Sequence, residues 1–415
     1  MIFRNAVARI TNVVSNPNWT RPELVSSFGL TSASGQKVTV ENSNNVSTAY
    51  RCINILSDDI GRMPLQTFIS RRPGEIERMR SNSIQKNIAY RLEKKPNRWQ
   101  TPFQFKKRST VWLLTHGNTY IWRPPRSENE LFTLSSNVTS PVFDVDGNLW
   151  YKTRFKNSRV DEYIHSEEIL HLLINPDETG IFGRGVIQYA RDTIGRQMAA
   201  HSSQDALYKR GLSAGGILWL DGEGSKEIRA KVRESYEETM SGVDNNNSIV
   251  ILDKKISKFE QLTMRPTDIQ FLQSIQQNDA EIANYFGLPL HKLNMGKQSY
   301  ESNAQQQIDY LSTTLDPYAV QWEEAAALKW LPDAEQDSTY FRFERSVLLR
   351  TDPKSRGEYL NSAINNGRLR PNEARQIEDR SADPDPAANF LYMPVNIQPM
   401  TMFNKKLQGD PNVQP

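Results

Sequence analysis

The sequence predicts an α+β fold, and three observations support this class. Apolar residues recur at helical spacing in residues 46–60 and 102–116. Residues 119–173 instead fall into short apolar runs, and Asp146-Gly147 between two of them is typical of an antiparallel hairpin. A third pattern, a helix, a polar loop and a second helix, runs from Asp268 to Leu331. We therefore expect long helices together with a module that contains an antiparallel sheet.

Length and composition describe a large globular chain. Its 415 residues are 37% hydrophobic and 24% charged, which suits about two to four structural modules. No apolar run approaches the roughly 18–20 residues of a membrane span, and residues 1–19 lack the continuous apolar core of a secretion signal. The single cysteine, Cys52, excludes an internal disulfide and a cysteine-based metal site, and it suits a reducing compartment.

The net charge of +3 is unevenly distributed along the chain. Residues 1–165 contain 24 Lys and Arg against 13 Asp and Glu, and the remaining residues contain 27 against 35. The two parts therefore carry +11 and −8. This asymmetry indicates either contact with nucleic acid or charge-complementary packing between neighbouring copies of the chain.

The first 185 residues are predicted to form an arm and a module. Residues 1–45 are expected to be an arm, since residues 20–45 are rich in Ser, Thr, Asn and Gly without a sustained period. In residues 46–185, Met63-Pro64 and Gly117-Asn118 end two of the predicted helices. The expected helices are 46–60, 83–93 and 102–116, with strands at 65–69, 120–122, 131–134, 142–145, 149–155 and 169–173.

The middle of the chain is predicted to be a helix followed by a small mixed unit. A turn with several glycines leads into a helix over residues 186–211. Residues 212–264 then form a strand–helix–strand unit that is short for an independent core and needs neighbours. Its expected elements are a strand at 216–220, a charged helix at 226–240, and strands at 249–252 and 258–262.

The remaining chain is predicted to be mainly helical. Residues 265–289 form a helix that ends in the turn Phe286-Gly287-Leu288-Pro289, and residues 290–303 form a polar loop. Residues 304–350 form a long helix kinked at Pro317, followed by a strand at 339–344. Two further helices occupy residues 351–380, and Pro371 can begin the second of them. Residues 381–415 contain six prolines and are expected to be extended or disordered.

Two groups of residues could bind a metal, and neither matches a known motif. His165, Glu167 and His171 would share one face if this segment were a continuous strand, but the helix-borne His-Glu-x-x-His pattern is absent. Asp144 and Asp146 resemble the start of a calcium loop whose remaining ligand positions are missing. We favour a hairpin turn at the aspartates and expect no metal, cofactor or catalytic residue.

Two further patterns each have a purely structural interpretation and a functional one. Gly180, Gly183 and Gly185 precede a helix and could cradle phosphate, but the Lys-Ser/Thr of a phosphate loop does not follow, so a tight turn is favoured. A basic cluster with two aromatic residues could grip phosphates, form a solvated face, or pair with the acidic part of a neighbouring copy. Its members are Lys94, Lys95, Arg98, Trp99, Phe103, Lys106, Lys107 and Arg108.

A series of short motifs in order resembles one protein family. The motifs are residues 47–53, Met63-Pro64-Leu65, residues 92–97, 116–120, 168–171 and 180–185, Glu281-Ile282-Ala283, Phe286-Gly287-Leu288-Pro289, Tyr300 with Asn303, Thr314-Leu315-Asp316-Pro317, Arg350-Thr351-Asp352 and residues 367–375. Each motif alone is weak, but the ordered series resembles the portal (head–tail connector) proteins of long-tailed double-stranded DNA bacteriophages. Leu290 departs from the family, which often has a second proline there.

The resemblance implies a homo-oligomeric ring, usually of twelve subunits, at one vertex of the capsid. Double-stranded DNA would pass through its axial channel, and the expected partners are the major capsid protein, the large terminase and head–tail adaptor or neck proteins, with no membrane partner. The expected location is the virion, and the host cytoplasm during assembly. The implied parts are a wing (46–185), stem helices (186–211 and 265–289), a clip (212–264), a tunnel loop (290–303), a helix returning to the wing (304–350) and a crown (351–380).

The resemblance also implies two sets of site residues. The tunnel loop would present to DNA Lys292, Asn294, Lys297, Gln298, Ser299, Tyr300, Ser302 and Asn303. The clip would dock the packaging motor and adaptors through Lys226, Arg229, Lys231, Arg233, Glu234, Asp244 and Asn245.

Residues 264–330 contain four Lys and Arg against eight Asp and Glu, so we expect a repulsive bore with sparse lysine contacts. Two alternatives stay open: a DNA-processing enzyme such as a nuclease, and an oligomeric scaffold that does not contact DNA.

Overall fold

The computed structural model describes twelve stretches of the chain and shows the mixed α+β architecture that the sequence predicts. The chain divides into two units, Met1–Arg345 and Ser346–Pro415. None of the helices in these stretches combines the length and the apolar content needed to cross a membrane. The described residues are 30–72, 75–79, 84–125, 129–156, 158, 160–210, 216–220, 256–261, 268–295, 303–349, 353–378 and 380–392.

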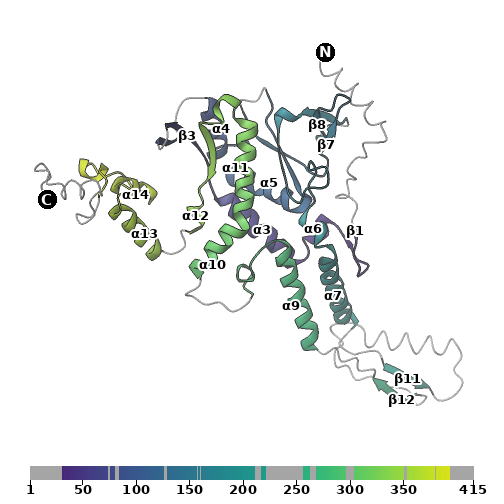
Figure 1. The fold of residues 1–415 in the computed structure, drawn as a ribbon. Coiled ribbons are helices and arrows are strands. Elements are labelled where there is room, and N and C mark those ends of the chain that lie inside the picture. Colours follow the sequence, from purple (N-terminus) through teal and green to yellow (C-terminus); the bar gives the residue numbers. More distant parts are fainter. Residues whose placement is uncertain are drawn as a thin grey trace, which may run out of the picture. The chain divides into compact units, whose positions relative to one another are not determined.

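Helix α3 (Ser47–Arg62) packs against helix α5 (Pro102–His116) and helix α9 (Asp268–Tyr285) in the first unit (Figure 1). Its apolar stripe, which includes Cys52, Leu56 and Ile60, is fully buried. Burial raises the pKa of the Cys52 thiol to about 12, so this cysteine is an inert core residue. The predicted ends hold, because Met63 stops α3 and Gly117 caps α5 in the left-handed conformation.

Apart from two separate two-stranded pairs, the described strands form three antiparallel sheets of three strands each, where the sequence suggested a single antiparallel sheet. Helix α4 (Ile84–Glu93) precedes α5, and a short 3-10 helix, η1 (Ser166–Glu168), separates two of the strands. The sheets are β10 (Ile169–Leu173) with β5 (Asn118–Trp122) and β6 (Phe132–Leu134); β7 (Ser140–Phe143) with β8 (Leu149–Thr153) and β9 (Glu162–His165); and β13 (Thr339–Phe343) with β3 (Leu65–Arg72) and β4 (Glu75–Arg78).

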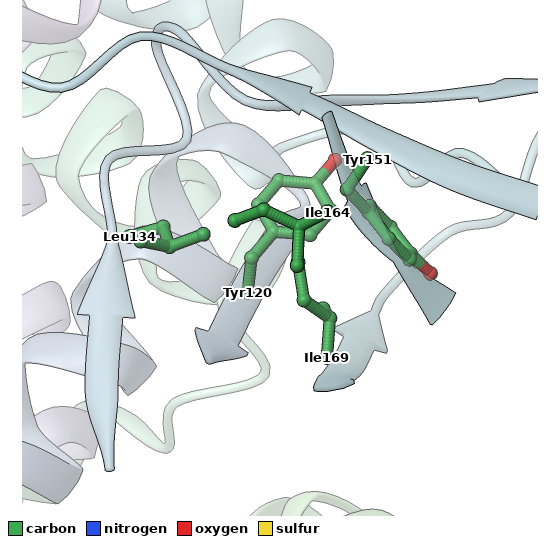
Figure 2. Close-up of a cluster of buried hydrophobic side chains, with 5 residues drawn as sticks. All are labelled: Tyr120, Leu134, Tyr151, Ile164 and Ile169. Atoms are coloured by element: carbon green, nitrogen blue, oxygen red, sulfur yellow. The ribbon is translucent and has the colours of Figure 1, made fainter. Parts of the chain in front are cut away.

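Two of these sheets share one hydrophobic cluster (Figure 2). Tyr120, Leu134 and Ile169 come from the first sheet, and Tyr151 and Ile164 come from the second. The rings of Tyr120 and Tyr151 meet edge to face with centroids 5.5 Å apart, a favoured aromatic geometry. The cluster explains why residues 119–173 divide into two sheets: the inward side chains of each sheet need a second apolar face to cover them.

The glycine-containing turn before residue 186 is a tight backbone contact, as favoured from the sequence. Asn118 holds it, because its amide nitrogen donates to the carbonyl oxygen of Gly183 at 2.7 Å and its side-chain oxygen accepts from the Gly183 amide at 2.8 Å. A Cβ at Gly183 would overlap the carbonyl oxygens of Gly117 and Ile174, and one at Gly185 would overlap that of Thr115. The turn therefore requires glycine for close backbone approach.

The helix predicted over residues 186–211 is interrupted at Ala190 and becomes α6 (Val186–Tyr189) and α7 (Arg191–Arg210). The described part of the predicted arm is folded. Its hairpin, β1 (Leu30–Thr31) and β2 (Lys37–Val38), packs on α7, and the short helix α2 (Val40–Ser43) follows. The amide of Ala33 donates to Asp192 at 3.0 Å, and Ser32 lies so close to Gly195 that a Cβ there would overlap it.

The predicted clip is represented by two strands. Strand β11 (Gly216–Leu220) pairs antiparallel with β12 (Ile256–Gln261), at the positions expected for the first and last strands. The helix expected at 226–240 and the strand expected at 249–252 lie outside the described residues.

The helix after the loop is continuous but changes its winding. Helix α10 (Asn303–Tyr310) leads through a π-helical turn, η5 (Leu311–Leu315), into α11 (Asp316–Trp330). Proline lacks the amide hydrogen that an α-helix interior needs, and the wider turn lets Pro317 lie in the first turn of α11. The kink predicted at this proline thus takes the form of a π-helical turn. Beyond α11, the turn η6 (Asp333–Glu335) leads into β13.

The second unit contains the two helices predicted for residues 351–380. They are α13 (Pro353–Asn365) and α14 (Pro371–Ile377), after the short helix α12 (Ser346–Leu349). The start of the predicted tail differs from expectation, because it folds back on α14 through a short 3-10 helix, η7 (Pro386–Asn389). The amide of Asp383 donates to the side chain of Asn372 at 2.7 Å. Residues 393–415 lie outside the described residues.

Replacing Gly185 by Ala is expected to destabilise the first unit by at least about 2 kcal/mol, because the new Cβ would overlap the Thr115 carbonyl oxygen although the φ angle itself is ordinary. Urea unfolding measures this change. Gly357→Ala, which places its Cβ in open space on α13, is the matched control and should stay within about 1 kcal/mol of the unaltered protein. Equal effects of the two variants would contradict the packing described for the turn.

Candidate functional site

The polar loop between α9 and α10 is the candidate site, and its two ends are described. Residues 290–295 follow α9, and Asn303 begins α10. The predicted DNA-facing residues Lys297, Gln298, Ser299, Tyr300 and Ser302 lie outside the described residues, so their role stays a prediction.

The helix that enters the loop ends in a well-defined cap. The amide of Leu288 donates to the Ala283 carbonyl at 2.9 Å, and that of Gly287 donates to Asn284 at 3.0 Å. Gly287 has a φ of 64°, so the pattern is a Schellman cap, which requires a left-handed residue. The hydroxyl of Thr314 donates to the Gly287 carbonyl at 2.7 Å, which fixes the cap to the π-helical turn after the loop.

The first residues of the loop are structured, which the sequence did not indicate. Leu290–Leu293 form a 3-10 helix, η3, in which Leu293 is buried. Asn294 ends this helix in the left-handed conformation, with a φ of 58°, and its side chain is exposed. The polar loop predicted over residues 290–303 therefore begins with a short helix instead of irregular structure.

Lys292, one of the two loop lysines, makes its contacts within its own chain. Its Nζ atom donates to the Gln307 side chain at 2.6 Å and lies 4.3 Å from the centre of the Tyr310 ring. Its carbonyl oxygen accepts from Arg51 of α3 at 3.3 Å. Burial lowers the pKa of Lys292. This lysine links residues 290–295, the base of the loop, to α10 and α3. Its predicted contact with DNA would require its side chain to leave these partners.

The buried carboxylate of Asp59 on α3 contacts Tyr310, the same residue that lies against Lys292. The hydroxyl of Tyr310 donates to Asp59 at 2.9 Å, and Asp59 lies on the buried face of α3. Burial raises the pKa of Asp59, although the hydrogen bond from Tyr310 and the charge of Lys292 act in the opposite direction. Desolvation of the carboxylate therefore outweighs its attraction to the nearby cations.

A second buried carboxylate fixes the helix before the loop. Asp279 of α9 accepts a hydrogen bond from Thr48 of α3, and a second from Gln197 of α7 at 3.2 Å. Glu281 on α9 pairs with Arg196 of α7 at 2.5 Å. Helix α9 is thus tied to both α3 and α7 by polar groups.

Helix α3 is therefore the common support of the loop. It holds the entering helix through Thr48, the loop base through Arg51 and the leaving helix through Asp59. These three residues lie along one helix, so the two ends of the loop are fixed relative to each other. Sequence reasoning missed this role, although a carboxylate within the apolar stripe of a predicted helix was a signal for a buried polar contact.

An open groove lies beside the loop base, between the α9 cap and α10. Its volume is about 350 Å³. The lining residues are Asn284, Gly287, Leu288, Pro289, His291, Gln306, Asp309, Tyr310, Thr313 and Thr314.

The residues predicted to dock the packaging motor are not among those that the structure describes. Lys226, Arg229, Lys231, Arg233, Glu234, Asp244 and Asn245 all lie outside the described residues.

The basic cluster is only partly available to a partner. Lys106 is buried, where it donates to the Met63 carbonyl oxygen, and burial lowers its pKa to about 7. Lys107 pairs with Asp58 at 2.6 Å, and Arg98 pairs with Glu130 at 3.2 Å. The exposed members that form no ion pair within the described stretches are Lys94, Lys95 and Arg108.

The histidines and glutamate considered as metal ligands lie on three different elements: His165 on β9, Glu167 on η1 and His171 on β10. The 3-10 helix η1 interrupts the strand between His165 and His171, and His165 caps it by accepting from the Glu167 amide at 3.2 Å. His171 is held at 3.0 Å from Asn118 and 3.2 Å from the Tyr151 hydroxyl. Burial lowers its pKa to about 3, so it is neutral. No group of three potential metal ligands occurs among the residues with described positions.

The aspartates that resemble a calcium loop instead form the favoured hairpin turn. Asp144 accepts from the amides of Asp146 and Asn148 at 2.9 and 2.8 Å, and Gly147 adopts a φ of 83° between β7 and β8.

Comparison with known proteins agrees with this arrangement of elements. A family model described as phage portal protein matches residues 47–379. The chain belongs to the phage portal protein family. It is 25% identical over 386 residues to the probable portal protein of Streptomyces phage phiC31, covering 89% of this chain and 82% of the relative. It is 24% identical over 341 residues to the portal protein of Enterobacteria phage HK97, and the match covers 80% of this chain and 78% of that protein.

Solved structures show the same fold. A chain in the virion of a native gene transfer agent particle matches with a TM-score of 0.56 and 16% identity, over 92% of this chain and 100% of that chain. A HK97-family phage portal protein from Corynebacterium diphtheriae matches with a TM-score of 0.54 and 12% identity, over 79% and 99%. The predicted identity is confirmed: the chain is a portal protein of the phage virion, located at the capsid vertex as a head–tail connector. This structural role does not favour the alternative of a DNA-processing enzyme.

Asp59→Asn is expected to change how stability depends on pH. Because burial raises the folded-state pKa of Asp59 above its unfolded value of about 3.9, its contribution is fully present below that value and is lost as pH rises through the folded-state pKa. Urea unfolding from pH 4 to pH 8 should show the unaltered protein losing stability relative to the variant. A difference that does not change with pH would contradict the raised pKa.

Tyr310→Phe should lower the free energy of unfolding by about 1–3 kcal/mol, since it leaves the buried Asp59 oxygen without its donor. The control is Tyr50→Phe, because Tyr50 is a tyrosine of α3 whose side chain is exposed. Thermal or urea unfolding distinguishes the two. If both variants unfold like the unaltered protein, the Tyr310–Asp59 bond is not a significant support of the loop.

Proposed function

We propose that twelve copies of this chain form a ring whose axial channel conducts double-stranded DNA into and out of the capsid, with residues 290–303 facing that channel. Family membership carries this proposal. A similar chain in the neck of a native gene transfer agent particle, computed with C12 symmetry, supports the subunit number. The anchored loop adds a physical reason, because a segment that touches moving DNA needs a support that does not yield.

The composition of the loop and its helices suits passage rather than tight binding. Phosphate contacts from Lys and Arg supply most non-specific DNA affinity, and residues 264–330 hold only four such residues against eight Asp and Glu. Lys292 is already committed to Gln307 and Tyr310. We assign direct DNA contact to Lys297 together with the polar residues Asn294, Gln298, Ser299, Tyr300, Ser302 and Asn303.

The partner assignments belong to the same proposal. The ring would contact the major capsid protein around its wing, residues 46–185. Residues 212–264 would dock the large terminase during packaging and head–tail adaptor or neck proteins afterwards, through the clip residues named above. The stem would be α7 and α9, which are joined by Arg196 and Glu281, and residues 351–380 would form the crown. Assembly would take place in the bacterial host cytoplasm.

Replacing each of the two loop lysines should have a different effect, on packaging for Lys297 and on subunit stability for Lys292. Lys297→Ala should leave ring formation intact and reduce DNase-protected DNA per particle several-fold, because it removes the direct contact. Lys292→Ala should lower the thermal stability of the subunit, because it removes the contacts of the lysine side chain with Gln307 and Tyr310. Complementation of a portal-deficient phage, followed by quantification of protected DNA, measures the first effect.

Lys37→Ala, which removes an exposed lysine of β2, is the control and should package normally. Full packaging and retention by a chain that lacks both loop lysines would contradict the proposed contact. Particles that assemble without any requirement for this chain would contradict the portal function itself.

A further inference from the structure

We propose that the outer face of α11, together with η6, binds the basic segment between α4 and α5 of the next copy of the chain. This inference rests on the proposed ring and identifies the surfaces that would form it. In a closed ring each subunit uses two different surfaces, so the two patches must be complementary and lie on opposite sides of one subunit.

Helix α11 has a buried apolar side and an exposed outer side. Its inner side, with Ala319, Trp322 and Ala326, is completely buried. Only five of its fifteen residues are charged or carry an amide, and two of these five, Asp316 and Glu323, bind Arg345 within the chain. The outer side is exposed at Glu324 and Leu328.

The outer side of α11 presents an exposed leucine among carboxylates. Leu328 is 66% exposed, and Glu324, one turn before it, is also exposed. Asp333 and Asp337 follow in and after η6 and are exposed too. Residues 321–338 hold five Asp and Glu and one Lys, a net charge of −4.

The segment between α4 and α5 has the opposite charge and an exposed aromatic residue. Residues 86–108 hold eight Lys and Arg and one Glu, a net charge of +7. Trp99 is 73% exposed, the highest value among the large hydrophobic residues of the described stretches. Lys94, Lys95 and Arg108 surround it in sequence, are exposed, and form no ion pair with any described residue.

Trp99 is held rigidly in its exposed position. The buried Asn97 side chain accepts from the Trp99 and Gln100 amides at 2.9 Å and donates to the Leu131 carbonyl at 2.8 Å. The ring of Phe132 lies 5.6 Å from that of Trp99. An aromatic side chain fixed in this way loses little entropy on binding, which is typical of the residues that dominate protein interfaces.

Helix α5, which follows the basic segment, and helix α11, which carries the acidic patch, meet through one pair of aromatic rings. Phe105 of α5 meets Trp322 of α11 with ring centres 6.3 Å apart. Arg108 lies on the side of α5 away from most of its buried residues, and Leu328 lies on the side of α11 away from the centre of its buried face, as the helical period and their exposure both show. Both patches are therefore exposed on the same subunit, and each is available to a neighbouring copy.

Reversing the charge of each patch separately gives a sharp test. One chain carries Glu324→Lys with Asp333→Lys, and a second chain carries Lys94→Glu with Lys95→Glu. In a ring of either chain alone every interface would join like charges, so we expect native mass spectrometry to show at least tenfold fewer rings. Mixing equal amounts should restore rings with alternating chains, because every interface then joins opposite charges and twelve is an even number.

The control chain carries Lys37→Glu with Glu178→Lys, two exposed positions outside both patches, and should form rings like the unaltered protein. Trp99→Ala should weaken rings without any change of charge. Rings from either charge-reversed chain alone, or a mixture that stays monomeric, would overturn this pairing while the unaltered ring still supports the portal proposal. Failure of the unaltered chain to form rings under any condition would count against both proposals. Binding of acidic proteins or DNA to Lys94 and Lys95 in intact rings would show that the basic patch serves a different partner.

Discussion

The burial of two carboxylates is the constraint on which the candidate site depends. Asp59 and Asp279 are removed from water, and a buried carboxylate is tolerated only where donors compensate for its lost hydration. Those donors are Tyr310 for Asp59, and Thr48 and Gln197 for Asp279. Because donors and acceptors come from α3 and from the helices on either side of the loop, satisfying them fixes the loop base in one position.

The two lysines of the polar loop have different roles in this arrangement. Lys292 is part of the support, since it contacts Gln307 and the Tyr310 ring. The acidic balance of residues 264–330 limits the attraction that DNA would feel in a channel lined by them. The charge asymmetry between the two parts of the sequence then has a natural use at the contact between subunits, where opposite charges on different faces favour one ring geometry over random association.

Much of the local structure could be predicted from the sequence, because proline and glycine fix helix ends. Met63-Pro64, Gly117 and Gly287 each end a helix where expected. The pairing of β13 with β3 could not be predicted, since about 270 residues separate these strands and no local pattern encodes their register. The Tyr310–Asp59 bond was missed for the same reason. Lys292 looked like a loop lysine because its 3-10 helix is too short to leave a periodic pattern.

Electron cryomicroscopy of the purified assembly tests the central claim most directly. We expect a ring with an axial channel at least about 20 Å wide, enough for a duplex whose major groove alone is about 12 Å wide. The segment after Asn294 should face that channel, with η3 and Tyr310 held against α3 as described here. A compact closed dimer without a channel, or a ring in which this segment lies on the outer wall, would contradict it.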